Sequence, residues 1–170
     1  MQSDHNQSQN LDPEKGQLLV KLARQTLMEH LGKQVPQGQI DSLNAALKDP
    51  CFQISCGTFV TLQIDEQLRG CIGNLTSNES LVSGVRRNAI NAGFHDPRFA
   101  PLNASELERV KIEISILTEP KPMNYRDDAD LIRKLKPGED GVTIRSTPRS
   151  ARAGRLTRRK SGYIRRDVPS

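Results

Sequence analysis

In the segment VKIEISIL, residues 110–117, apolar and polar side chains alternate from Val110 to Ile116. One side of this segment is aliphatic: Val110, Ile112, Ile114 and Ile116. The other side is polar: Lys111, Glu113 and Ser115. Successive side chains of a strand point to opposite faces of a sheet. The segment is therefore expected to be a half-buried strand of an antiparallel sheet, with one face on a core.

Helical spacing surrounds this strand. Asp12, Pro13 and Glu14 combine an N-cap residue, a first-turn proline and a first-turn acid. An apolar stripe follows, and Gly32 ends it, which predicts a helix over 13–31. Further elements are expected as follows: a helical turn or two over 41–47, a hairpin of 57–64 and 68–75 around 65–67, a helix over 78–94, a short helix opened by the Asn103–Glu106 capping box, a brief helix over 130–135 and a strand over 141–145.

This order of elements predicts an α+β fold, with a mainly antiparallel sheet and flanking helices. Residues 1–11 are polar and are expected to form a disordered lead. Residues 12–146 are expected to form the folded domain. Residues 147–170 lack any apolar periodicity and are expected to form a disordered basic tail.

Charge separates the tail from the domain. Residues 145–170 hold nine arginines and lysines and one acid, a formal charge of +8, whereas the first 144 residues carry −3. The Arg, Ser, Gly and Ala bias of the tail is what a GC-rich gene yields out of frame, so we hypothesise a frameshift. The alternative is a genuine basic tail. Such a tail would bind nucleic acid only non-specifically, because Tyr163 alone offers a stacking surface.

The motif LRGCIG, residues 68–73, is the first candidate for chemistry. A nearby arginine favours the nucleophilic thiolate of a cysteine, and Arg69 is two residues from Cys71, on the same side of a regular strand. Gly70 and Gly73 permit close approach of a ligand or of backbone. The alternative is that Cys71 packs in the core as a small apolar residue, with the glycines in a bend or bulge.

The motif HDPRF, residues 95–99, is the second candidate. Asp96 and Arg98 are expected either to bind a polar ligand or to orient the strand of Arg69 and Cys71. The alternative is a turn fixed by Pro97, with Asp96 as a cap and Phe99 in the core.

Metal and cofactor motifs are weak or missing in the sequence. Cys51, Cys56, Cys71 and His95 do not form the two paired ligand sets of structural zinc, so no metal site is expected. The phosphate-binding glycine loops and the radical SAM cysteine cluster are absent, so no cofactor is expected. A catalytic Cys–His pair would need His95, His30 or His5 brought to Cys71 by folding.

Four segments together resemble the AMMECR domain family: LRGCIGNL, AINAGFHDPRFAPL, KIEISILTEPKPM and PGEDGVTIRS. The likeness runs from about Asp12 to Ser150 and implies an α+β fold of two unequal lobes, with the cysteine motif near a cleft. Family members continue into a further strand and helix, which the present tail does not resemble. The short bacterial form is similar to protein A of a system whose other members resemble a radical SAM enzyme and a Memo-like protein.

Three functions follow from these observations, in order of preference. The first is an accessory, partner-binding component of that modification system. The second is an enzyme with Cys71 as nucleophile or acid/base, Arg69 activating it, and Asp96 and Arg98 positioning the substrate. The third is association with nucleic acid through the tail. Three cysteines argue against a disulfide framework, and no apolar run suggests a signal peptide or a membrane span, so a cytoplasmic location is expected.

Overall fold

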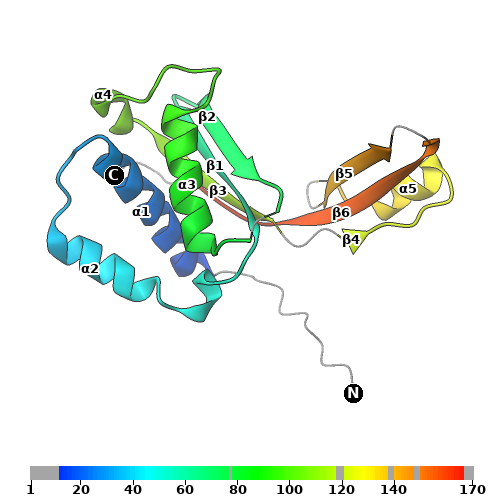
Figure 1. Cartoon of the computed structure of the whole chain (residues 1–170), viewed down its shortest axis with the longest axis horizontal. Helices are drawn as coiled ribbons and strands as arrows, with labels where there is room; N and C mark the ends of the chain where they lie inside the picture. The colour runs from blue at the N-terminus through cyan, green and yellow to red at the C-terminus, as the bar shows by residue number, and fades with distance from the viewer. Residues whose placement is uncertain (1–11, 77, 118–120, 138–139, 148–149, 167–170) are drawn as a thin grey trace.

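The computed structural model describes residues 12–76, 78–117, 121–137, 140–147 and 150–166, the last two ranges by their backbone alone. It is an α+β fold of two unequal lobes (Figure 1). The larger lobe contains four helices, α1 (Pro13–His30), α2 (Gln37–Ala46), α3 (Leu81–Phe94) and α4 (Ala104–Leu107), the 3-10 turn η1 (Pro50–Phe52), and the strands β1 (Gly57–Ile64), β2 (Gln67–Asn74) and β3 (Lys111–Leu117). The smaller lobe contains β4 (Lys121–Pro122), α5 (Asp128–Lys134) and β5 (Asp140–Thr147).

With β6 (Ser150–Arg166), the sheet is antiparallel at every described pair, in the order β2-β1-β3-β6-β4, and β5 also pairs with β6. Strand β6 is shared by both lobes, as Figure 1 shows. Its first part pairs with β4 and β5, and residues 161–166 pair with β3. The two lobes are thus joined by one continuous strand.

The core lies between one face of β1–β3 and the helices α1 and α3 (Figure 1). The alternation predicted for 110–117 is confirmed, because its four aliphatic side chains are buried and its polar ones are not. Val60 and Leu62 of β1 are buried on the same face. The opposite face of the sheet carries the half-buried side chains of the three strands.

Local signals place most boundaries. Asp12 caps α1 by accepting from the Lys15 backbone N–H, as the sequence predicts. The capping box of Asn103 and Glu106 at α4 is also confirmed. Helix α2 begins four residues earlier than expected, at Gln37. The hairpin turn is tighter than expected: Asp65 and Glu66 both have positive φ, as a two-residue type I′ turn requires.

The structure differs most from the sequence expectation after Ser146. Strand β5 runs to Thr147, and Ser150–Arg166 form β6 where a disordered basic tail was expected. Residues 167–170 and the expected lead, 1–11, lie outside the described residues. Strand β6 is held by backbone pairing to β3, β4 and β5, and such pairing needs no periodicity of apolar side chains. Hydropathy alone therefore did not reveal it.

Within the described ranges, no helix combines the length and the hydropathy that crossing a membrane requires.

Candidate functional site

Strand β2 presents the LRGCIG motif at the outer edge of the sheet, next to β1. The register is interrupted there: Gly70 faces Leu62, and Leu68 faces Gln63. Arg69 is therefore the additional residue of a β-bulge, and the strict alternation expected for Arg69 and Cys71 does not hold. Bulges re-aim side chains, and this one directs Arg69 toward α4, where its partner Glu106 lies.

Cys71 lies directly opposite Thr61 of β1. Its sulfur is 3.2 Å from Thr61 Oγ1. Thr61 alternates with the buried Val60 and Leu62, so both side chains lie on the sheet face away from α1 and α3. The thiol is half-buried, so it is neither sealed in the core nor fully open.

Asp96 and Arg98 hold the backbone of Cys71, and we call this arrangement the Asp96–Arg98 clamp. Asp96 Oδ2 accepts from the Cys71 N–H at 2.9 Å, and Arg98 Nη2 donates to the Cys71 carbonyl oxygen at 3.2 Å. Arg98 also binds the Asp96 carboxylate, through Nε at 2.9 Å and Nη2 at 2.7 Å. The clamp thus satisfies both outward backbone groups of an edge-strand residue, as a further strand would.

The charge of Asp96 is strongly stabilised although its side chain is only 2% exposed. Hydrogen bonds from the Arg98 side chain, together with the backbone N–H groups of Cys71 and Arg98, hold the pKa of Asp96 well below its usual range and outweigh the effect of burial. The Asp96 carboxylate is therefore ionised in the folded protein near neutral pH. A proton-accepting role for Asp96 is disfavoured by the same contacts.

The guanidinium group of Arg69 is bound to the carboxylate of Glu106. Its Nε and Nη2 donate to the two carboxylate oxygens at 2.8 and 3.0 Å, and Nη2 also donates to the carbonyl oxygen of Ala100 at 2.9 Å. The same Glu106 closes the capping box of α4 through the Asn103 N–H. The ring centroid of Phe99 lies 5.8 Å from the guanidinium carbon of Arg69 and 5.4 Å from that of Arg98.

Both glycines of the motif are required by packing inside the protein. A Cβ on Gly70 would lie 2.1 Å from the carbonyl oxygen of Ala92 in α3. A Cβ on Gly73 would lie 2.3 Å from the ring of Phe59 and from the carbonyl oxygen of Thr58. The close approach expected at these glycines is therefore made by the protein's own backbone and an aromatic ring.

The three cysteines differ in environment. Burial raises the pKa of Cys56, just before β1, to about 11. Burial also raises the pKa of Cys51 in η1, where Asp49 adds to the shift and Lys15 opposes it. Cys71 has Thr61 as its side-chain neighbour, and its half-exposed thiol is the one placed within the motif.

The histidines lie in other contacts. His95 ends α3, where its Nδ1 is 3.1 Å from Asn91 Oδ1. His30 stacks on Phe94, with ring centroids 4.2 Å apart. In the part of the chain that the structure describes, no contact joins a histidine to Cys71, and His5 lies outside it. Nor do three His, Cys, Asp or Glu side chains converge as metal ligands among those residues.

The structure thus brings together all six sequence candidates: Cys71, Arg69, Gly70, Gly73, Asp96 and Arg98. Sequence reasoning missed the partners Thr61, Phe99 and Glu106 as members of the site. The Glu106 signal was visible as a capping box, but its contact with Arg69 spans 37 residues of sequence. The contacts of Asp96 and Arg98 with the Cys71 backbone fit the strand-orienting role, and the Arg98 N–H that donates to Asp96 Oδ1 at 3.2 Å fits the alternative of a capped turn.

The chain is similar to a protein family and to several proteins of known sequence. The AMMECR1 family model matches residues 20–156. Protein MK0488 of Methanopyrus kandleri is 36% identical over 155 residues, which cover 87% of this chain and 69% of the relative. A protein of Methanothermobacter thermautotrophicus is 35% identical over 137 residues, with 79% and 67% covered. The chain therefore spans about two thirds of the length of these relatives.

A solved structure shares the fold. The crystal structure of protein PH0010 from Pyrococcus horikoshii superimposes with a TM-score of 0.70 and 24% sequence identity. The match covers 89% of this chain and 96% of that one.

Proposed function

Because the chain belongs to the AMMECR1 family, we propose that it is an accessory, partner-binding component of a cytoplasmic modification system. The other components are a radical SAM enzyme and a Memo-like protein, as the resemblance to the bacterial protein A implies. In this role the protein recognises or positions another protein, and the redox chemistry belongs to the radical SAM enzyme.

One observation carries the proposal: the charged residues around Cys71 are used to build the site. Arg69 is bound to Glu106, and Asp96 and Arg98 are bound to each other and to the Cys71 backbone. Groups held in this way shape and stiffen a surface. They do not supply a base beside the thiol, which cysteine nucleophiles require.

The direct test is assembly of the three purified proteins from the same organism. We expect the chain to form a complex with the radical SAM enzyme or with the Memo-like protein, measured by light scattering after size exclusion and by calorimetry. Adding the chain should also change the turnover of the radical SAM enzyme. Three proteins that stay monodisperse and show unchanged turnover in every mixture would contradict the proposal.

The enzyme hypothesis is favoured by one separate feature, the half-exposed thiol of Cys71 within 3.2 Å of Thr61 Oγ1. In this alternative Cys71 attacks an electrophilic substrate and Thr61 orients the thiol. The two hypotheses differ in what Cys71→Ser does. If the protein is an accessory component, Cys71→Ser should leave partner binding intact. If it is an enzyme, the exchange should abolish turnover by the chain alone and remove the mass increment of a covalent intermediate at Cys71.

A further inference from the structure

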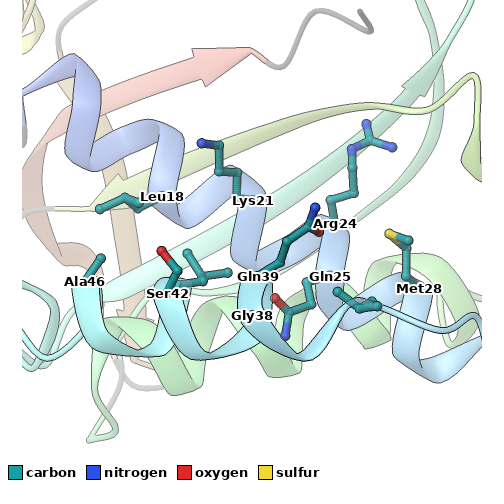
Figure 2. Close-up of a pocket in the computed structure, with 11 residues that line it drawn as sticks. Leu18, Lys21, Arg24, Gln25, Met28, Gly38, Gln39, Ser42 and Ala46 are labelled. Carbon is teal, nitrogen blue, oxygen red and sulfur yellow. The ribbon is translucent and has the colours of Figure 1, made fainter.

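A groove of about 850 Å³ runs between α1 and α2, on a different part of the larger lobe from the Cys71 motif. Figure 2 shows its walls: Lys21 and Gln25 come from α1, Gln39 and Ser42 come from α2, and the Lys21 side chain extends from α1 away from α2. Leu18 and Ala46 lie at one end of the groove and Met28 at the other (Figure 2). Eleven residues line it, and they include apolar, amide and basic side chains.

The spacing along both walls is that of a helix–helix seam. On α1 the lining positions are 18, 21, 24, 25 and 28, which are related to one another by intervals of three and four residues. On α2 the lining positions are 38, 39, 42, 43 and 46, which are related by the same intervals. Side chains three and four residues apart lie along one face of a helix, and such a face packs against a neighbouring helix. At about 1.5 Å per residue, the α1 row is roughly 15 Å long, which matches about three turns of a third helix.

Helix α2 leaves this stripe open. Of its ten residues only Leu43 is buried, whereas α1 buries eight of eighteen. Gly38, in the first turn of α2, also lines the groove, and an added Cβ there would meet nothing within 4 Å. No neighbour in the described part of the chain requires a glycine at this position. A glycine inside a helix lowers its stability relative to alanine, so close approach by something outside the chain is a physical reason for it.

The charge of the groove specifies the partner further. Lys21 and Arg24 are among the lining residues, and none of the eleven is acidic. Arg24 donates to the carbonyl oxygens of Leu107 and Val110, at 3.1 and 2.6 Å, so its guanidinium is fixed by the fold. Lys21 is exposed, and no ion pair within the described residues engages its ammonium group. A bound segment with carboxylates along its border would pair with Lys21.

We propose that the α1–α2 groove is a docking site for an amphipathic helix of a partner protein, about three turns long, with apolar anchors along one face and acidic residues along its border. The assignment deepens the proposed function and rests on its premise that the protein acts by binding another protein. Leu18, Met28 and Leu43 receive the anchors, Gly38 and Ala46 admit the close approach, and Lys21 pairs with the acidic border. This is helix-in-groove recognition, read from anchors at helical spacing.

The test uses the full chain and two designed peptides of about three helical turns. Both carry leucines along one face and one tryptophan among them, with borders of glutamate in one peptide and of lysine in the other. The chain contains no tryptophan, so peptide fluorescence reports binding directly. We expect micromolar binding of the glutamate peptide, and at least about a tenfold loss with Lys21→Glu. The lysine peptide should bind the Lys21→Glu variant more tightly than the unaltered chain.

Two further variants separate the groove from general charge effects. Lys48→Glu makes the same charge change at an exposed lysine that is not among the lining residues, and it should leave affinity within about twofold. Ser42→Phe fills the groove at an exposed position and should weaken both peptides. Equal effects of Lys21→Glu and Lys48→Glu, unchanged binding by Ser42→Phe, or no binding at millimolar peptide would overturn the proposal. A dimer of the chain that Ser42→Phe dissociates would also overturn it, because the occupant would then be a second copy.

Failure of the groove proposal and failure of the proposed partners give different results in the peptide experiment and the assembly experiment. Peptide binding without a complex with the radical SAM enzyme or the Memo-like protein would support the groove and contradict the named partners. A complex unaffected by Lys21→Glu and Ser42→Phe would support the partners and overturn the groove.

Discussion

At the scale of single residues, Asp96 and its partner Arg98 form the backbone hydrogen bonds with Cys71 that a neighbouring strand would otherwise form. The Asp96 carboxylate accepts the Cys71 N–H, and it positions Arg98 to donate to the Cys71 carbonyl oxygen. An exposed strand edge invites pairing with other chains. The clamp closes this edge at Cys71 with two side chains that are two residues apart in sequence.

Asp96→Asn should therefore destabilise the fold. The asparagine amide cannot accept all the hydrogen bonds that the two carboxylate oxygens accept, and it leaves the charge of Arg98 uncompensated. We therefore expect the free energy of unfolding to fall by roughly 2–4 kcal/mol. Denaturant unfolding measures it. The matched control is Asp65→Asn, in an ion pair whose side chains are 60–70% exposed, which should change stability by less than about 1 kcal/mol.

The pH dependence of this loss has a definite sign. The folded-state pKa of Asp96 lies below its unfolded value of about 3.9, so its contribution is fully present above that value. The contribution is lost as pH falls toward the folded pKa. The stability difference between the unaltered chain and Asp96→Asn should thus shrink below about pH 4. A difference that stays constant down to the acid limit of folding would show that the charge of Asp96 is not what the clamp needs.

Cys71 and Cys56 should be alkylated at different rates in the folded protein. All three cysteines are half-buried, but burial raises the pKa of Cys56 to about 11 and so disfavours its thiolate. We therefore expect the folded protein to be alkylated faster at Cys71 than at Cys56 at every pH from neutral to mildly alkaline. Peptide mass spectrometry after short exposure to iodoacetamide resolves the sites. Denaturant should abolish the difference. Equal rates in the native protein would mean that the edge of β2 and the start of β1 open together.

At the scale of elements, the packing of β2 on α3 depends on one glycine. Gly70→Ala places a Cβ 2.1 Å from the backbone oxygen of Ala92, which no side-chain rotation relieves. We expect a loss of about 1–3 kcal/mol, measured by thermal or denaturant unfolding. Gly38→Ala is the matched control, because nothing lies within 4 Å of its Cβ and α2 gains helix propensity. If Gly70→Ala were as harmless as Gly38→Ala, strand and helix would not be in tight contact.

The elements also show what local sequence can predict. Helix starts at Asp12 and Asn103, the hairpin and the alternation of β3 are set by neighbours along the chain, so propensity and pattern identify them. The bulge at Arg69 was not predicted at its position, because it shows only against the partner strand. The contact of Asp96 with Cys71 spans 25 residues and that of Arg69 with Glu106 spans 37, so spacing identified these residues as candidates but not their roles.

At the scale of the whole molecule, β6 is the element on which both lobes depend. It pairs with β5 from Ser150 to Lys160 and with β3 from Ser161 to Arg166. Its composition, rich in arginine and without apolar period, predicted a disordered tail. A strand paired along its whole length draws on backbone hydrogen bonds, which side-chain patterns do not encode. The long reach of β6 is therefore a property of the assembled sheet.

Hydrogen exchange tests this role directly. Backbone amides of 161–166 that bond to β3 should exchange far more slowly than an unfolded chain, at rates comparable to those of β1. A chain ending at Lys160 keeps the pairing with β5 but frees the edge of β3 along residues 113–117, so amides there should lose protection and the protein should associate more readily. A chain ending at Arg166 keeps all described pairs and serves as the control. Rapid exchange of 161–166 in the full chain, with β3 equally protected in both shortened chains, would instead assign these residues to the disordered tail that their sequence suggested.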